Sequence, residues 1–242
     1  MSFRIAMWSG PRNISTAMMR AWGNRADTFV CDEPFYAFFL KQTGRDDPGR
    51  NEIIKNGETT WTSVVAQLTG PIPGGKAVYY QKHMTHHLLP EIDRDWMRRV
   101  TNCFLIRDPA EVIASYVKKK ADPTLEDIGF VQQEEIFDWV RQETNTIPPV
   151  IDACDILENP AATLTSLCRS IGVPFTDTML CWPPGLRQTD GIWAKYWYPE
   201  VATSTGFREP APRQAVVIPE RLKPIHDRAL ECYERLYRHR LI

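Results

Sequence analysis

Hydrophobic and polar positions follow two different periods along the first three quarters of the chain. Short apolar runs bounded by polar or turn-forming residues are typical of buried strands, whereas apolar positions three and four residues apart are typical of helices. On this basis we predict strands at residues 3–8, 28–31, 77–81, 103–106 and 150–153. The predicted helices are 15–22, 59–68, 109–119, 130–144, 160–171 and, near the end of the chain, 219–238.

Strands that alternate with helices in this way form parallel βαβ units with right-handed crossovers. We therefore expect an α/β fold with a central parallel sheet and helices on both faces. The chain has 242 residues, which suits one large domain, and no linker divides it, so residues 1–242 are predicted to form a single domain. Residues 182–215 show neither period but are rich in Trp and Tyr, so we expect an ordered, loop-rich cover there.

Composition restricts the classes of function. The sequence is 43% hydrophobic and 24% charged with a formal net charge of −1, so a general attraction to nucleic acid or to acidic membranes is not expected. Its six cysteines are spread singly without CxxC spacing, which favours reduced thiols and a cytoplasmic location. No apolar run reaches the roughly 18 residues of a membrane span. The N-terminus becomes polar too early for a secretory signal.

The segment Ser-Gly-Pro-Arg-Asn-Ile-Ser-Thr, residues 9–16, joins a predicted strand to a predicted helix. Such a junction directs backbone N–H groups and the positive end of the helix at one point, where an anion can bind. Arg12 adds a full charge, and the hydroxyls of Ser15 and Thr16 add hydrogen-bond donors. The Walker A lysine is missing, which argues against an ATP or GTP site. Taken alone, these residues fit a plain strand-to-helix turn with a capping serine equally well.

A second strand-to-helix junction lies at residues 104–116, Phe-Leu-Ile-Arg-Asp-Pro-Ala-Glu-Val-Ile-Ala-Ser-Tyr. It places Arg107 at the end of a strand and Ser115 in the following helix. Together the two junctions resemble the sulfotransferase family, in which a P-x-S-G-T-T-like loop binds the 5′-phosphosulfate of PAPS. An R-[ND]-P-x-[DE]-V-x-x-S-Y-like segment of that family binds the 3′-phosphate. Residues 155–160 and 171–174 also match the family's D-L-x-x-x-P and L-G-[IV]-P segments.

The resemblance extends over roughly residues 4–175 and is greatest to a bacterial sulfotransferase-like group, some members of which are named after branched-chain aminotransferases. It implies a three-layer P-loop-like α/β fold. It also implies transfer of a sulfuryl group from PAPS to a hydroxyl or amine of a small-molecule acceptor, with PAP as product and without a metal. The residues that it assigns to the 5′-phosphosulfate are Arg12, Asn13, Ile14, Ser15 and Thr16, and those that it assigns to the 3′-phosphate are Arg107 and Ser115.

The phosphate loop departs from the family pattern at two positions. Ile14 stands where the family loop usually has Gly, and Asn13 replaces a Ser. Because Gly permits a close approach of the backbone to a ligand, we expect the contact with the phosphosulfate to differ here. Arg12 and the loop amides are expected to stabilise charge on the transferring group.

Two sets of residues compete for the role of general base. Glu33 follows the second predicted strand, and its position resembles the base of tyrosylprotein-type sulfotransferases. The other set is the segment Lys-His-Met-Thr-His-His at residues 82–87. Cytosolic sulfotransferases carry Lys-x-His in this place, but Met84 occupies the His position, so His83 or His86 would have to substitute. A histidine in such a segment is also often only a surface or capping residue.

Other functions stay open at this point. The three histidines lack a helical Glu and a Cys pair, so we expect no metal site. A nucleotide kinase shares the predicted architecture but needs the missing lysine, and a nucleotide-binding protein without turnover is compatible with Ile14. An aminotransferase would need a Schiff-base lysine, and no lysine has a context that marks one. The aromatic segment at 182–215 fits a hydrophobic cover, a loop that closes over nucleotide and acceptor, or the contact face of a homodimer.

Overall fold

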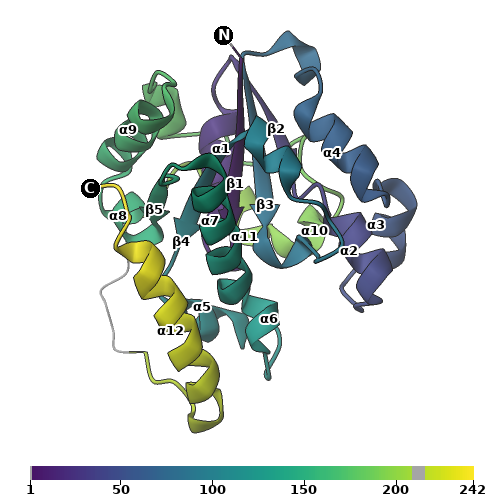
Figure 1. The fold of residues 1–242 in the computed structure, drawn as a ribbon, viewed down its shortest axis with the longest axis vertical. Helices are drawn as coiled ribbons and strands as arrows, with labels where there is room; N and C mark the ends of the chain where they lie inside the picture. The colour runs from purple at the N-terminus through teal and green to yellow at the C-terminus, as the bar shows by residue number, and fades with distance from the viewer. Residues whose placement is uncertain (1, 209–215) are drawn as a thin grey trace.

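A computed structural model describes residues 2–208 and 216–242 and has a five-stranded sheet at its centre (Figure 1). The strands are β1 (Phe3–Ser9), β2 (Thr28–Asp32), β3 (Val78–Met84), β4 (Thr101–Ile106) and β5 (Val150–Asp152). They lie in the order β2-β3-β1-β4-β5, and every neighbouring pair is parallel. Strands β2 and β3 lie on one side of β1, and β4 and β5, which come later in the chain, lie on the other side. The carboxyl end of β1 is therefore the switch point at which ligands bind in such sheets.

Helices cover both faces of the sheet, as the predicted α/β fold requires. Successive strand residues point to opposite faces, so Met7 and Trp8 belong to different apolar clusters. The Met7 face is covered by α1 (Ser15–Gly23), α8 (Ala153–Glu158) and α9 (Pro160–Ile171). The Trp8 face is covered by α4 (Trp61–Thr69), α7 (Phe130–Thr144) and α12 (Lys223–Tyr237), and α7 crosses in front of the sheet in Figure 1.

Several short helices, most of them not predicted from the sequence, follow the strands. Helices α2 (Tyr36–Thr43) and α3 (Arg50–Asn56) lie with α4 beyond β2 (Figure 1). Helices α5 (Pro109–Tyr116) and α6 (Leu125–Ile128) follow β4, and α5 ends before the predicted residue 119. Helices α10 (Ala194–Trp197) and α11 (Pro199–Ala202) belong to residues 182–208, which we call the cover segment. Residues 209–215 of the predicted cover lie outside the described residues.

The length of β3 matters most for the site. The prediction ended this strand at residue 81, but the ladder with β1 continues to Met84. Lys82 and His83 are therefore consecutive strand residues, and their side chains point to opposite faces of the sheet. Within the described parts of the chain, no helix is long and apolar enough to cross a membrane.

Candidate active site

The phosphate loop, residues 10–14, leaves the switch point at the end of β1 and enters α1. Arg12 and Ile14 have positive φ angles of 61° and 46°, a conformation that is costly for a β-branched residue. The backbone thus takes up at Ile14 the left-handed conformation that a Gly would adopt freely. Gly10 permits close packing at the start of the loop, since a Cβ atom there would lie 2.6 Å from the carbonyl oxygen of Ile128.

The structure brings the two predicted phosphate-binding segments into direct contact. Arg12 Nε donates to Ser115 Oγ at 2.8 Å, and Arg107 Nη1 donates to the carbonyl oxygen of Arg12 at 2.8 Å. Arg107 also forms an ion pair with Glu111, with Nε and Oε2 2.8 Å apart. Arg12, Arg107 and Ser115 therefore line one polar region beside the N-terminus of α1.

Asn13 plays a different part in the loop from its neighbours. Its Nδ2 donates to the carbonyl oxygen of Leu105 in β4 at 2.7 Å, and the residue is only 3% exposed. Gln133 of α7 donates to the same carbonyl at 2.9 Å. The Asn13 amide therefore fixes the loop to the sheet. Ser9, which the sequence analysis did not select, ends β1 with a buried hydroxyl that has no hydrogen-bond partner among the described residues.

Glu33 follows directly after β2 and has a positive φ of 42°. Non-glycine residues in this conformation are strained and tend to occur at functional sites. Burial raises the pKa of Glu33, the nearby Lys82 ammonium opposes this, and the Asp32 carboxylate reinforces it. The pKa of Glu33 is raised overall because two carboxylates share one ammonium group here. A carboxylate whose pKa is raised is suited to act as a general base near neutral pH.

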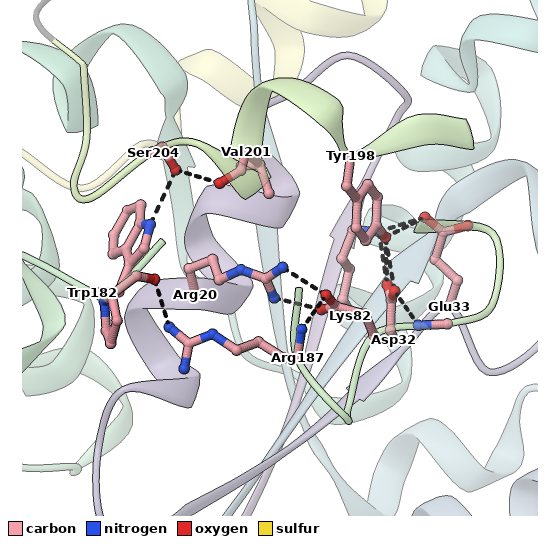
Figure 2. Close-up of polar contacts among 12 residues, drawn as sticks. Arg20, Asp32, Glu33, Lys82, Trp182, Arg187, Tyr198, Val201 and Ser204 are labelled. Atoms are coloured by element: carbon pink, nitrogen blue, oxygen red, sulfur yellow. Dashed lines mark hydrogen bonds and ion pairs between the residues drawn. The ribbon is translucent and has the colours of Figure 1, made fainter. Parts of the chain in front are cut away.

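Lys82 is buried between these two carboxylates (Figure 2). Its Nζ contacts Glu33 Oε1, and it lies 3.0 Å from Asp32 Oδ1. Burial favours the neutral amine, but Asp32 and Glu33 outweigh it and raise the pKa of Lys82 well above its usual value. The sequence did not mark Lys82 as part of a buried site, because this residue follows directly after the strand predicted at residues 77–81. Lysine is rarely buried without a partner.

The histidines of residues 83–87 have separate environments. His83 lies on the Trp8 face, stacked on Trp8 with ring centroids 4.4 Å apart, so the structure does not bring it together with Glu33 and Lys82. Burial lowers the pKa of His83 to about 3 and that of His86 to about 4. His86 packs against Phe39, and its Nδ1 has no hydrogen-bond partner among the described residues. The histidine nearest to Glu33 is His87, with Nδ1 3.9 Å from Glu33 Oε2.

The cover segment packs over the carboxyl ends of β2 and β3, where Asp32 and Lys82 lie. Asp190 forms a buried two-bond ion pair with Arg20 of α1, at 2.5 and 2.7 Å. The Gly191 amide donates to Asp32 Oδ2 at 3.0 Å, and the Tyr198 hydroxyl lies 2.8 Å from both Asp32 carboxylate oxygens (Figure 2). The sequence analysis did not identify these partners, because their contacts link residues more than a hundred positions apart and no motif marks them.

No cluster of three or more potential metal ligands occurs within residues 2–208 and 216–242. Arg12, Arg107 and the N-terminus of α1 suit an anionic group, and the Glu33 carboxylate suits the role of a proton acceptor.

Comparisons with known proteins point to one family. A family model described as a sulfotransferase domain matches residues 3–229. Two proteins of Arabidopsis thaliana, branched-chain-amino-acid aminotransferase-like proteins 1 and 2, are 37% and 35% identical over 206 residues, 85% of this chain. The chain spans only 37% and 36% of their lengths.

Solved structures with similar folds are also sulfotransferases. One from Alicyclobacillus acidocaldarius aligns over 100% of this chain and 98% of its own, with a TM-score of 0.56 and 12% identity. The sulfotransferase domain of the Synechococcus PCC 7002 olefin synthase aligns over 98% and 96%, with a TM-score of 0.53 and 14% identity. At such identities the likeness shows the fold alone. Since the family match extends over nearly the whole chain, this protein belongs to the sulfotransferase family.

Proposed function

We propose that this protein transfers a sulfuryl group from PAPS to a hydroxyl group, or an amine, of a small molecule. The observation that carries the proposal is the contact of Arg12 with both Ser115 and Arg107, at 2.8 Å each. Residues far apart in the sequence thereby form one cationic region, and its charge suits the phosphate groups of the nucleotide. The 5′-phosphosulfate would lie on Arg12, Ser15, Thr16 and the loop amides, and the 3′-phosphate on Arg107 and Ser115.

Glu33 is the proposed general base. As the acceptor oxygen bonds to sulfur, Glu33 takes the proton of the acceptor hydroxyl, and the bond from sulfur to the bridging phosphate oxygen breaks. PAP leaves with the electron pair of that bond, and Arg12 with the loop amides stabilises its developing charge. The products are a sulfate ester, PAP and a proton that Glu33 releases to water. Lys82 holds Oε1 of Glu33, so Oε2 is the oxygen available to the acceptor.

The test measures nucleotide binding by titration calorimetry with PAP, ATP and 5′-AMP. We expect PAP to bind more tightly than the other two nucleotides. Arg107→Ala should weaken PAP binding by about 2 kcal/mol, roughly 30-fold, because a charged hydrogen bond to the 3′-phosphate is lost. Arg141→Ala, on the exposed side of α7, is the matched control and should bind as the unaltered protein does.

A second set of measurements distinguishes nucleotide binding from catalytic turnover. Glu33→Gln should retain PAP affinity but lower the release of PAP from PAPS, in the presence of a panel of phenols, alcohols and amines, by roughly 100-fold or more. Equal affinity for PAP and 5′-AMP would contradict the assignment of the 3′-phosphate site. Preference for ATP would favour a kinase, and PAP binding without turnover by any acceptor would favour a binding protein.

A further inference from the structure

A hydroxyl group from the cover segment completes the charged network around Glu33. Tyr198 is only 5% exposed, and its hydroxyl oxygen accepts a hydrogen bond from Lys82 Nζ at 2.8 Å. It also accepts one from Trp193 Nε1 at 3.3 Å. Burial and the charge of Asp32 raise the pKa of Tyr198 well above its usual value, so the hydroxyl stays protonated. It donates a hydrogen bond to the Asp32 carboxylate.

These contacts use the full hydrogen-bonding capacity of Lys82. An ammonium group has three N–H donors, and here they meet Asp32, Glu33 and Tyr198 (Figure 2). With all three donors occupied, the ammonium has one favoured position, and Glu33 Oε1 is fixed by it. A lysine with a missing partner would keep rotational freedom or draw in water. The position of Glu33 therefore depends on a residue more than 160 positions later in the chain.

The same hydroxyl reduces the effect of Asp32 on Glu33. Asp32 accepts from Lys82, Tyr198 and the Gly191 amide, so part of its negative charge is neutralised by the cover segment. Without the Tyr198 donor, Asp32 would compete more strongly for Lys82. Glu33 would then lose part of its stabilising contact, and its carboxylate would be protonated more easily.

We propose that Tyr198 is a positioning residue of the sulfuryl-transfer reaction. Through Lys82 and Asp32 its hydroxyl holds Glu33 in place as a base, so the base is complete only when the cover segment is docked. The inference rests on the proposed role of Glu33. Asp190 and Gly191 anchor the preceding part of the segment on α1 and β2, which directs Tyr198 toward the site.

The experiment compares three forms of the full chain. Tyr198→Phe removes only the hydroxyl and keeps the ring in the buried position. Tyr196→Phe is the matched control, because Tyr196 lies in the same turn but outside the contacts of Asp32, Glu33 and Lys82. The third form carries 3-fluorotyrosine at position 198 alone, which keeps the ring and makes the hydroxyl a stronger donor, so it addresses the same contact if Tyr198→Phe does not fold.

The main measurement is the titration of the Glu33 carboxyl carbon by NMR, assigned by the signal that Glu33→Gln removes. We expect the Glu33 pKa to rise in Tyr198→Phe, to fall in the fluorotyrosine form, and to stay unchanged in Tyr196→Phe. PAP release from PAPS, with the acceptor panel described above, should fall roughly tenfold in Tyr198→Phe, the equivalent of one lost hydrogen bond. PAP affinity should not change.

Two results would overturn the proposal: a folded Tyr198→Phe protein in which the Glu33 titration is unmoved, or a fluorotyrosine form that shifts it in the same direction as Phe. Either would make Tyr198 only a packing residue of the cover. Failure of the proposed function gives a different pattern. In that case Glu33 still responds to Tyr198 by NMR, but Glu33→Gln has no effect on PAP release.

Discussion

The buried imidazole of His83 should make the protein lose stability in mild acid. Its ring is enclosed by Trp8, Phe35 and Trp96, with centroids 4.4, 5.8 and 5.6 Å away, and the residue is 1% exposed. Burial, with a smaller contribution from the Lys82 charge, lowers the pKa of His83 from 6.5 to about 3. The test is His83→Leu, which keeps a similar volume and cannot take up a proton.

The direction and the size of this loss of stability follow from proton linkage. Below pH 6.5 the unfolded chain binds a proton at His83, whereas the folded protein does so only below about pH 3. Stability due to this group is therefore present at neutral pH and is lost as the pH falls between these values. Between pH 7 and pH 5 the loss amounts to about 2 kcal/mol. A folded-state pKa of 4 instead of 3 would leave this figure nearly unchanged, because pH 5 lies above both.

Urea unfolding at several pH values between 5 and 8 measures the effect. His83→Leu will be less stable than the unaltered protein near pH 8, since it loses the packing and the contact with Gln81. This deficit should stay constant above about pH 7 and shrink by about 2 kcal/mol at pH 5. The constant region serves as the internal control for packing.

A deficit that stays the same from pH 8 to pH 5 would refute the reasoning. So would a His83 ring signal that titrates near pH 6.5 by NMR. Either result would mean that the ring reaches solvent, and His83 would return as a candidate base beside Glu33.

Two further predictions concern the ion pair of the cover segment and the phosphate loop. Asp190→Asn should lower the free energy of unfolding by about 3 kcal/mol, because the buried Arg20 keeps its charge without a partner. Glu52→Gln, which removes the exposed partner of Lys195, should leave the free energy of unfolding nearly unchanged, and a loss as large as that of Asp190→Asn would contradict this assignment. Ile14→Gly should be more stable than Ile14→Ala by about 1 kcal/mol in urea unfolding, since only Gly adopts the positive φ freely. The reverse order would show that the loop relaxes when the side chain is removed.

The sequence was a good guide wherever local pattern and local structure coincide. The five strands and the helices α1, α4, α5, α7, α9 and α12 lie where periodicity placed them, apart from their ends. The family resemblance of the two strand-to-helix junctions agrees with the family match. Helix α2 was missed because its residues Phe38, Phe39 and Leu40 are all buried, so it has no polar face to give a period.

The end of β3 was the least visible boundary and had the greatest consequence. The polar residues Lys82 and His83 follow an apolar run, so residues 82–84 look like the start of a loop. Pairing with β2 continues to Lys82 and pairing with β1 extends the strand to Met84, and the alternation of faces then separates His83 from Lys82. One strand residue therefore contributes to the candidate site and its neighbour to the core.

Local features of the sequence were sufficient to predict the alternation of strands and helices, the parallel sheet, the two strand-to-helix junctions and the presence of Glu33 at a strand end. These features depend on residues close together in the chain, where hydrophobic period and turn chemistry act directly. The contacts of Arg12 with Ser115 and Arg107, the position of Lys82 between Asp32 and Glu33, and the contact of Tyr198 with Lys82 became apparent only from the folded structure. These contacts arise when the sheet and the cover segment pack together. A single sequence carries no signal for them, because a buried charge is recognisable only once its partner is beside it.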